Sequence, residues 1–230
     1  MTIKGSATKT LLVLCFLSYF HLIADRSFAT TFQKRTYDEN GNISLIIELK
    51  KDSSETKETY FWPNGKIKKV LLFKNEEQNG LESHFYENGQ LKANIPYLGG
   101  LKNGKMESWY EDGAYLGFAF FKNGHHDKIS KAWHPNGEIR AIARFKNFLQ
   151  EGLEIQYYSN GKKRVEGYFQ KGVLHGTETR WHKNGNLKAK LVYENGDLEE
   201  VLGTWDQDGR RRKLSEKQEQ EILRGDKFVH

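Results

Sequence analysis

Cysteine is almost absent from this chain, and its apolar content is low. The 230 residues include a single cysteine, Cys15, and the hydrophobic fraction is 37%. A chain with one thiol has no disulfide framework and no cluster of thiolate ligands. Aromatic residues nevertheless make up 13% of the chain. Few aliphatic side chains and many rings favour a thin β-sheet covered by aromatic residues over a thick globular core.

The motifs of the common catalytic mechanisms are also missing. The sequence has no Gly-x-Ser-x-Gly and no phosphate-binding glycine loop. His125, His126 and Asp127 form the one tight group of potential metal ligands, but a metal site needs further converging ligands, so we expect a solvated loop there. His134 and His182 occupy equivalent repeat positions, and we interpret them as structural. We therefore predict no enzyme, no metal, no cofactor and no small-molecule substrate.

The first 29 residues resemble a secretory signal peptide. Lys4 and Lys9 precede an apolar run that starts at Leu11, and Ser27-Phe28-Ala29 has the small-x-small pattern of a signal-peptidase site. The alternative, an uncleaved anchor, is less favoured because the run is short for a span of about 20 residues. We expect cleavage near Ala29 and export to the periplasm, cell surface or medium. Cleavage would remove Cys15, three basic residues and one acid, which changes the net charge from +6 to +4.

Glycine recurs every 24 residues without a slip. Six of these ladder glycines follow asparagine and two follow aspartate. Asn-Gly and Asp-Gly favour the type I′ turn of a β-hairpin, in which both central residues have positive φ. A strict period of this length is the signature of a repeat array. The predicted structural turns are at Gly41, Gly65, Gly89, Gly113, Gly137, Gly161, Gly185 and Gly209.

Aromatic residues recur with the same period. Four residues before each ladder glycine stand Tyr37, Phe61, Phe85, Trp109, Trp133, Tyr157, Trp181 and Trp205. Eight residues after it, six of seven units have another aromatic, and the residues between alternate with period two, which indicates a strand with one buried face. A second glycine-containing loop follows, and a second strand returns to the next Asn-Gly. Each unit is thus predicted to be a β-hairpin.

The segment 145–185 resembles the bacterial variant of the MORN-repeat family, with its aromatic-aromatic-x-Asn-Gly and Gly-x-x-x-Gly patterns. The resemblance covers roughly residues 37–209. It implies an elongated single-layer antiparallel sheet with a groove lined by aromatics. Bacterial members are often labelled antitoxins, and other MORN proteins are scaffolds or phospholipid-headgroup binders. The signal peptide departs from the antitoxin label, because an antitoxin normally works in the cytosol.

The predicted organisation has three parts. Residues 1–29 form the signal peptide, residues 30–209 an all-β meander of about seven 24-residue hairpin repeats, and residues 210–230 a basic segment with a helical cap. Ser215 and Gln218 have the spacing of a capping box, so we expect a short helix over about 215–224 that covers the last sheet edge.

Two surfaces are candidate binding sites. The aromatic groove would consist of Trp109, Trp133, Tyr157, Trp181 and Trp205. Three residues after the ladder glycine runs a basic stripe, broken at Leu116, which we expect to project from the face opposite the apolar positions: Lys68, Lys92, Arg140, Arg164, Lys188 and Arg212. Alternatively, the rings only cover the sheet, and the stripe is a solvated face balanced by acids such as Glu154.

Three functions fit these surfaces. The first is a non-enzymatic exported scaffold that binds a protein partner through the aromatic groove. The second is a peripheral binder of anionic membrane through the basic stripe. The third is an antitoxin or immunity-type protein that neutralises a cognate toxin. Nucleic acid is not expected as a partner of an exported chain.

Overall fold

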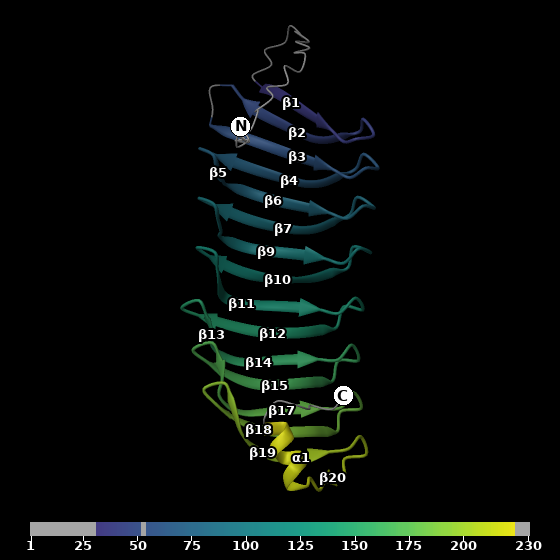
Figure 1. Cartoon of the computed structure of the whole chain (residues 1–230), viewed down its shortest axis with the longest axis vertical. Helices are drawn as coiled ribbons and strands as arrows, with labels where there is room; N and C mark the ends of the chain where they lie inside the picture. The colour runs from purple at the N-terminus through teal and green to yellow at the C-terminus, as the bar shows by residue number, and fades with distance from the viewer. Residues whose placement is uncertain (1–30, 52–53, 224–230) are drawn as a thin grey trace, which may run out of the picture. The chain divides into compact units, whose positions relative to one another are not determined.

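The computed structural model describes residues 31–51 and 54–223, so the predicted signal peptide lies outside the described residues. These residues form one open antiparallel sheet of 20 strands in meander order, followed by a short helix (Figure 1). The all-β meander predicted from the 24-residue period is confirmed. Each strand of six or more residues pairs with the next such strand along the chain, from β1 (Thr31–Tyr37) to β19 (Asp197–Trp205).

Each unit contributes two long strands. Those of the first half are β1 (Thr31–Tyr37), β2 (Ile43–Lys50), β3 (Glu55–Phe61), β4 (Ile67–Lys74), β6 (Gly80–Phe85), β7 (Leu91–Leu98), β9 (Gly104–Trp109) and β10 (Tyr115–Lys122). Those of the second half are β11 (His125–Trp133), β12 (Ile139–Lys146), β14 (Gly152–Tyr157), β15 (Lys163–Gln170), β17 (Gly176–Trp181), β18 (Leu187–Glu194) and β19 (Asp197–Trp205). Two-residue strands are β5 (Glu77–Gln78), β8 (Leu101–Lys102), β13 (Leu149–Gln150), β16 (Val173–Leu174) and β20 (Arg211–Arg212).

The ladder turns differ from the predicted type I′ geometry. Every ladder glycine has positive φ, from 78° at Gly65 to 94° at Gly185, but none of the preceding asparagines does. In the turn at Gly65, the N–H of Gly65 donates to the carbonyl of Trp62 and the N–H of Trp62 donates to the carbonyl of Lys66. This is a three-residue hairpin loop, a type I turn closed by a glycine in the left-handed region. The type I′ prediction for the Asn-Gly pairs was wrong because only the glycine needs the left-handed conformation here.

Type I′ geometry occurs in the distal turns, which connect the strands at the ends opposite the ladder turns. In the six distal turns from Asn75-Glu76 onward, both central residues have positive φ, as in Asn123-Gly124 (50° and 83°). Glu76 and Phe148 take the glycine position in two of these turns, with φ of 66° and 69°. The pairing of the flanking strands holds even these non-glycine residues in the left-handed region.

The buried side chains are few. The most buried hydrophobic residues are Leu71, Ala93, Ile95, Ala189 and Leu191. Leu191 is 0% exposed and Ala189 is 1% exposed. Both lie on β18, next to β19 at the C-terminal end of the sheet. Stability therefore rests on backbone pairing and on thin, local packing more than on a central core.

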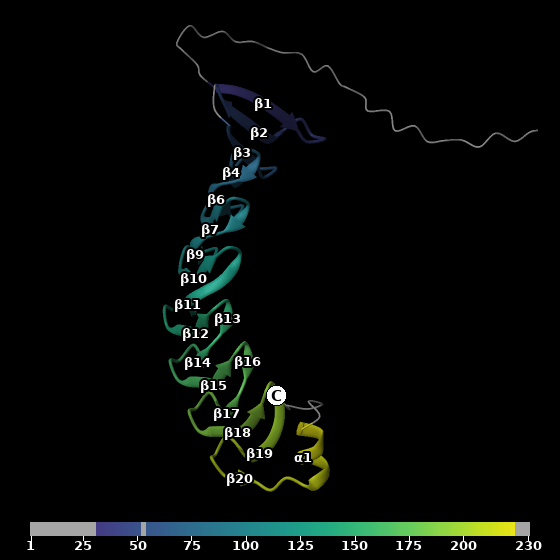
Figure 2. The same ribbon diagram turned by 90° about the vertical axis from the view of Figure 1, so that its left-hand side faces the viewer.

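The C-terminal helix, α1 (Glu216–Leu223), packs against β19. Figure 2 shows α1 beside β19, on one side of the sheet. Its capping box forms as predicted, since Ser215 Oγ accepts from the N–H of Gln218 and Gln218 Oε1 accepts from the N–H of Ser215. At eight residues α1 is short, and no helix in residues 31–51 and 54–223 has the length and apolarity to cross a membrane.

Candidate functional site

A ladder of side-chain hydrogen bonds joins successive units from Trp62 onward. In six of the eight units, the residue three before the ladder glycine carries a ring with an N–H or O–H, which donates to a backbone carbonyl 23 residues further on. Asp38 and Asp206 occupy this position in the first and last units. Tyr110 Oη reaches the carbonyl of Trp133 at 2.8 Å, and His134 Nε2 reaches that of Tyr157 at 2.9 Å. The full set of donors is Trp62, Tyr86, Tyr110, His134, Tyr158 and His182. The two histidines thus have the structural role expected of a repeat position.

The ladder asparagines form a second set of inter-unit bonds. Asn160 Nδ2, for example, donates to the carbonyl of Lys183 at 2.8 Å, while its Oδ1 accepts from the N–H of Lys162. Asp112 keeps the second bond, to the N–H of Ala114, but its carboxylate has no N–H with which to make the first. The asparagines that make both bonds are Asn64, Asn88, Asn136, Asn160 and Asn184.

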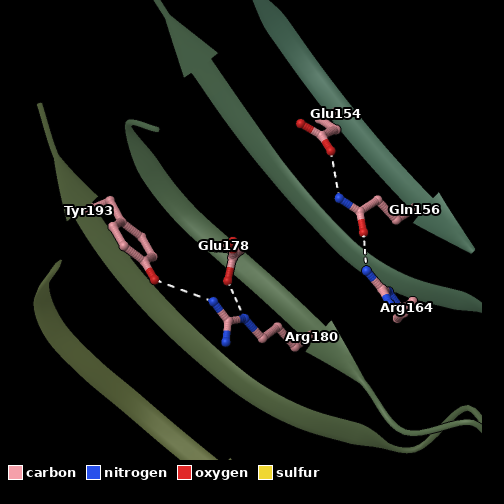
Figure 3. Close-up of polar contacts among 6 residues, drawn as sticks. All are labelled: Glu154, Gln156, Arg164, Glu178, Arg180 and Tyr193. Carbon is pink, nitrogen blue, oxygen red and sulfur yellow. Dashed lines mark hydrogen bonds and ion pairs between the residues drawn. The ribbon is translucent and has the colours of Figure 1, made fainter. Parts of the chain in front are cut away.

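One side of the sheet, which we call the polar face, carries hydrogen-bonded charged and amide side chains (Figure 3). Gln156 donates to Glu154 at 2.6 Å and accepts from Arg164 at 2.5 Å. One unit further, Arg180 bonds both Glu178 and the hydroxyl of Tyr193. A similar arrangement occurs in the N-terminal half, where Glu82 bonds both Gln78 and His84.

Burial and charge set the acidity of this face. Burial and the Glu178 carboxylate raise the pKa of Tyr193. Burial also raises the pKa of Tyr97, with a further contribution from Glu82. Both tyrosine hydroxyls therefore keep their protons at neutral pH, and that of Tyr193 accepts the bond from Arg180.

The basic stripe lies on the polar face, not opposite it. Arg164 bonds Gln156, which shares its face with Glu154. Lys68 lies 4.4 Å from the ring centroid of Trp62, and Lys92 lies 5.2 Å from that of Tyr86. We expected the stripe to project from the face opposite the neighbouring apolar positions, and this prediction was wrong. The pairing register of the two strands shifts beside the ladder turn, as opposite Gln156 and Tyr157. This bulge turns the stripe residue to the polar face.

The predicted groove aromatics lie on the other side of the sheet. Successive side chains of a strand alternate between faces, so Tyr157 points away from Gln156 and Trp181 points away from Arg180. We call this side the aromatic face. Trp109, Trp133, Tyr157, Trp181 and Trp205 are all half-buried. The backbone carbonyls of these same five residues accept the inter-unit hydrogen bonds, which fixes the backbone from which each ring projects.

Five rings on the aromatic face form an aromatic cluster, made of Trp109, Tyr115, Phe118, Phe120 and Trp133. The Tyr115 ring lies between the two tryptophans, at 5.8 Å from Trp109 and 5.3 Å from Trp133. Phe118 lies 5.9 Å from Trp133 and 5.7 Å from Phe120. Within the described residues the only helix packs against β19, so no second layer covers these half-buried rings.

Charged groups border the aromatic cluster. Lys105 lies 5.0 Å from the Phe118 ring and Lys128 lies 5.4 Å from the Phe120 ring. Tyr115 donates its hydroxyl to Glu107 at 2.9 Å, and burial together with this bond raises the pKa of Tyr115 to about 12. The hydrogen bond from Lys105 lowers the pKa of Glu107. The cluster is thus an apolar surface with fixed charges at its rim.

The units match a known repeat. The MORN repeat variant family matches residues 55–75, 78–98, 127–147, 150–171 and 174–200. The chain is a MORN-repeat protein. No curated protein matches the chain.

The MORN match leaves out residues 99–126, and the aromatic cluster lies mainly there. Tyr115, Phe118 and Phe120 belong to this segment, as does Trp109. Leu116, which interrupts the basic stripe, lies in the same segment. An internal unit without a MORN match therefore carries the aromatic cluster.

Sequence reasoning found two of the five rings in the cluster, Trp109 and Trp133, but missed Tyr115, Phe118 and Phe120. These three are not at the offsets where aromatic residues recur from unit to unit, so a search for periodic aromatics passes over them. The signal for them was local: the run from Tyr115 to Phe121 has four aromatic residues in seven.

The histidine pair is solvent-exposed as expected, but it lies in a strand and not in a loop. His125 and His126 begin β11, directly after the turn at Asn123-Gly124. The His126 ring stacks on Phe145 at 4.7 Å and packs at 4.5 Å from Phe121. His126 is exposed, but partial desolvation beside the two phenylalanine rings, with a smaller contribution from Lys102, lowers its pKa. In the described part of the chain, no three His, Cys, Asp or Glu side chains gather in a group that could hold a metal ion.

Proposed function

We propose that this MORN-repeat protein is a non-enzymatic scaffold that binds a protein partner through the aromatic cluster. The observation that carries the proposal is the cluster of half-buried rings on a single-layer sheet, without a second layer over it in the described residues. A contiguous apolar patch on a protein surface marks an interaction site. Tryptophan and tyrosine are also the residues that most often dominate binding at protein interfaces.

The rim of the cluster supports a protein over a lipid surface. Lys105 and Glu107 form an ion pair at 2.6 Å, and Tyr115 adds a hydroxyl to the same carboxylate. An apolar centre with a polar rim of both signs is the composition of a protein interface. An anionic lipid surface would favour basic residues alone. From the predicted signal peptide we infer a partner outside the cytoplasm.

A matched pair of variants tests the proposal. Trp133→Ala removes a ring that contacts Tyr115 and Phe118. Trp181→Ala removes a ring at the same repeat position, which has Lys163 Nζ 5.6 Å from its centroid. Both variants lose one half-buried tryptophan, so their losses of stability should be comparable and can be checked by thermal unfolding.

The readout is partner retention by immobilised residues 30–230 from envelope and secreted fractions, identified by mass spectrometry. We expect Trp133→Ala to lose a protein that Trp181→Ala and the parent chain retain in near-equal amount at moderate salt. Equal retention by the two variants, with both folded, would show that the cluster is not the binding surface.

A further inference from the structure

The chain has many Asn-Gly pairs. The exposed pairs fall into two classes that differ in the hydrogen bonds of the asparagine side chain. The five ladder asparagines named above have their side-chain amide held on both atoms, by a carbonyl of the next unit and by a nearby backbone N–H. For the side chains of Asn40, Asn123 and Asn195, the structure of the described residues contains no hydrogen bond. All of these asparagines are exposed, so accessibility does not separate the classes.

We propose that Asn40, Asn123 and Asn195 are sites of spontaneous deamidation, and that the inter-unit ladder protects the other exposed Asn-Gly pairs. The pairs at Asn79 and Asn103 are a different case, since they are half-buried within the sheet and precede glycines that pair with β7 and β10. The modification is intramolecular and needs only water as a co-reactant.

The chemistry follows from the residue after asparagine. The backbone nitrogen of Gly124 attacks Cγ of Asn123, and a new N–Cγ bond forms while the Cγ–Nδ2 bond breaks. Nδ2 leaves as ammonia and takes the proton of the glycine N–H. Water then opens the resulting cyclic imide at either carbonyl, which gives aspartate or isoaspartate. Glycine favours the attack because it has no side chain to hinder its nitrogen.

The side-chain bonds are the relevant difference between the classes. In both, the glycine N–H is itself hydrogen-bonded, to the carbonyl of Lys102 for Gly124 and to that of Tyr158 for Gly161. Its release is therefore a common requirement. In the ladder class, however, the amide must also leave two further bonds before Cγ can turn toward the nitrogen, as at Asn160. Two such bonds correspond to about a tenfold or greater difference in rate.

One of the three sites, Asn123, lies in the unit that carries the aromatic cluster. Asn123 precedes the two histidines that begin β11, and Lys102 lies nearby, over the Phe121 ring. Deamidation adds a negative charge there, and isoaspartate also lengthens the backbone of a type I′ turn. A chain deamidated at Asn123 would differ from the unmodified chain within residues 99–126, the segment outside the MORN match.

The test is a time course on folded residues 30–230 at mildly alkaline pH, with each Asn-Gly peptide quantified by mass spectrometry after digestion. The same chain in concentrated urea supplies the intrinsic rate of every pair. We expect similar rates for all pairs in urea. In the folded chain, we expect the three unheld sites to react at least about tenfold faster than the five ladder sites.

The Asp112→Asn variant gives an independent check. It creates a new exposed Asn-Gly pair at a ladder position, and the new side chain should make both bonds and be as slow as its ladder neighbours. Two results would overturn the proposal: ladder sites that deamidate as fast as Asn123 in the folded chain, or a fast reaction at position 112 in the folded variant. Neither depends on whether the aromatic cluster binds a partner.

Discussion

The unit at residues 99–126 and the unit at residues 150–171 share one backbone plan but differ in the side chains that each face carries. In the second, the polar face carries Glu154 and Gln156. In the first, the equivalent strand β9 has Met106 and Ser108 there, while Phe118 and Trp109 enlarge the aromatic face. The turns and inter-unit bonds are nearly the same in both. The repeat is therefore maintained by backbone and edge contacts, which leaves each face free to vary.

Glycine substitution should show the largest difference between the two units. A Cβ on Gly117 would lie 2.5 Å from the backbone oxygen of Lys131, whereas a Cβ on Gly167 would meet the end of the Leu174 side chain at 2.8 Å. Backbone cannot move aside as a leucine methyl can. We expect Gly117→Ala to lower the free energy of unfolding by about 2–3 kcal/mol and Gly167→Ala by less than about 1 kcal/mol. Urea unfolding of both variants measures this, and equal losses would contradict the steric account.

The inter-unit hydrogen bond that Asp112 cannot make gives a second, smaller contrast between the units. Asp112→Asn should add the inter-unit bond that the aspartate cannot make, toward the carbonyl at position 135, and raise the free energy of unfolding by about 1 kcal/mol. Asn160→Asp is the matched reverse change, which removes the bond to Lys183 and should lower it by a similar amount. Thermal or urea unfolding compares the pair. A loss of stability in Asp112→Asn would mean that the asparagine side-chain bonds between units do not extend across this unit.

The pH dependence of the aromatic cluster is a further contrast, visible only in alkali. The pKa of Tyr115 is about 12 in the folded chain and about 10 in an unfolded one, so the unfolded state loses its proton first. The stabilisation is complete below pH 10 and is lost as pH rises toward 12. Tyr115→Phe should therefore flatten part of the decline in stability over this range. Unfolding at a series of alkaline pH values, with Tyr158→Phe as the control, measures the difference.

Much of the fold could be predicted because the 24-residue period repeats every structural requirement eight times. The ladder glycines, the strand alternation and the capping box at Ser215 are each local signals with local causes. The faces were harder to assign. The register shift beside each ladder turn, as between Gln156 and Tyr157, changes which side a residue faces, and alternation alone cannot reveal it.

The candidate site was only partly visible for a related reason. Trp109 and Trp133 follow the period, but Tyr115 and Phe118 join them only through cross-strand packing in one unit. The ring donors such as Tyr110 were also missed, because their acceptors are backbone carbonyls in the next unit and leave no side-chain pattern. Those contacts depend on how units stack, and a single unit's sequence does not show it.

The smallest expected effect concerns the break in the basic stripe. Leu116→Lys would complete the stripe through the unmatched unit, and the half-buried position suits a lysine whose stem packs while its charge reaches water. We expect a change in stability within about 0.5 kcal/mol, as for most surface substitutions. Sedimentation with anionic vesicles should also stay unchanged, because stripe residues such as Arg164 share their face with carboxylates such as Glu154. A clear, salt-sensitive gain in sedimentation, reversed by Lys92→Gln, would instead favour the membrane hypothesis, since each exposed lysine near anionic lipid contributes about 1 kcal/mol.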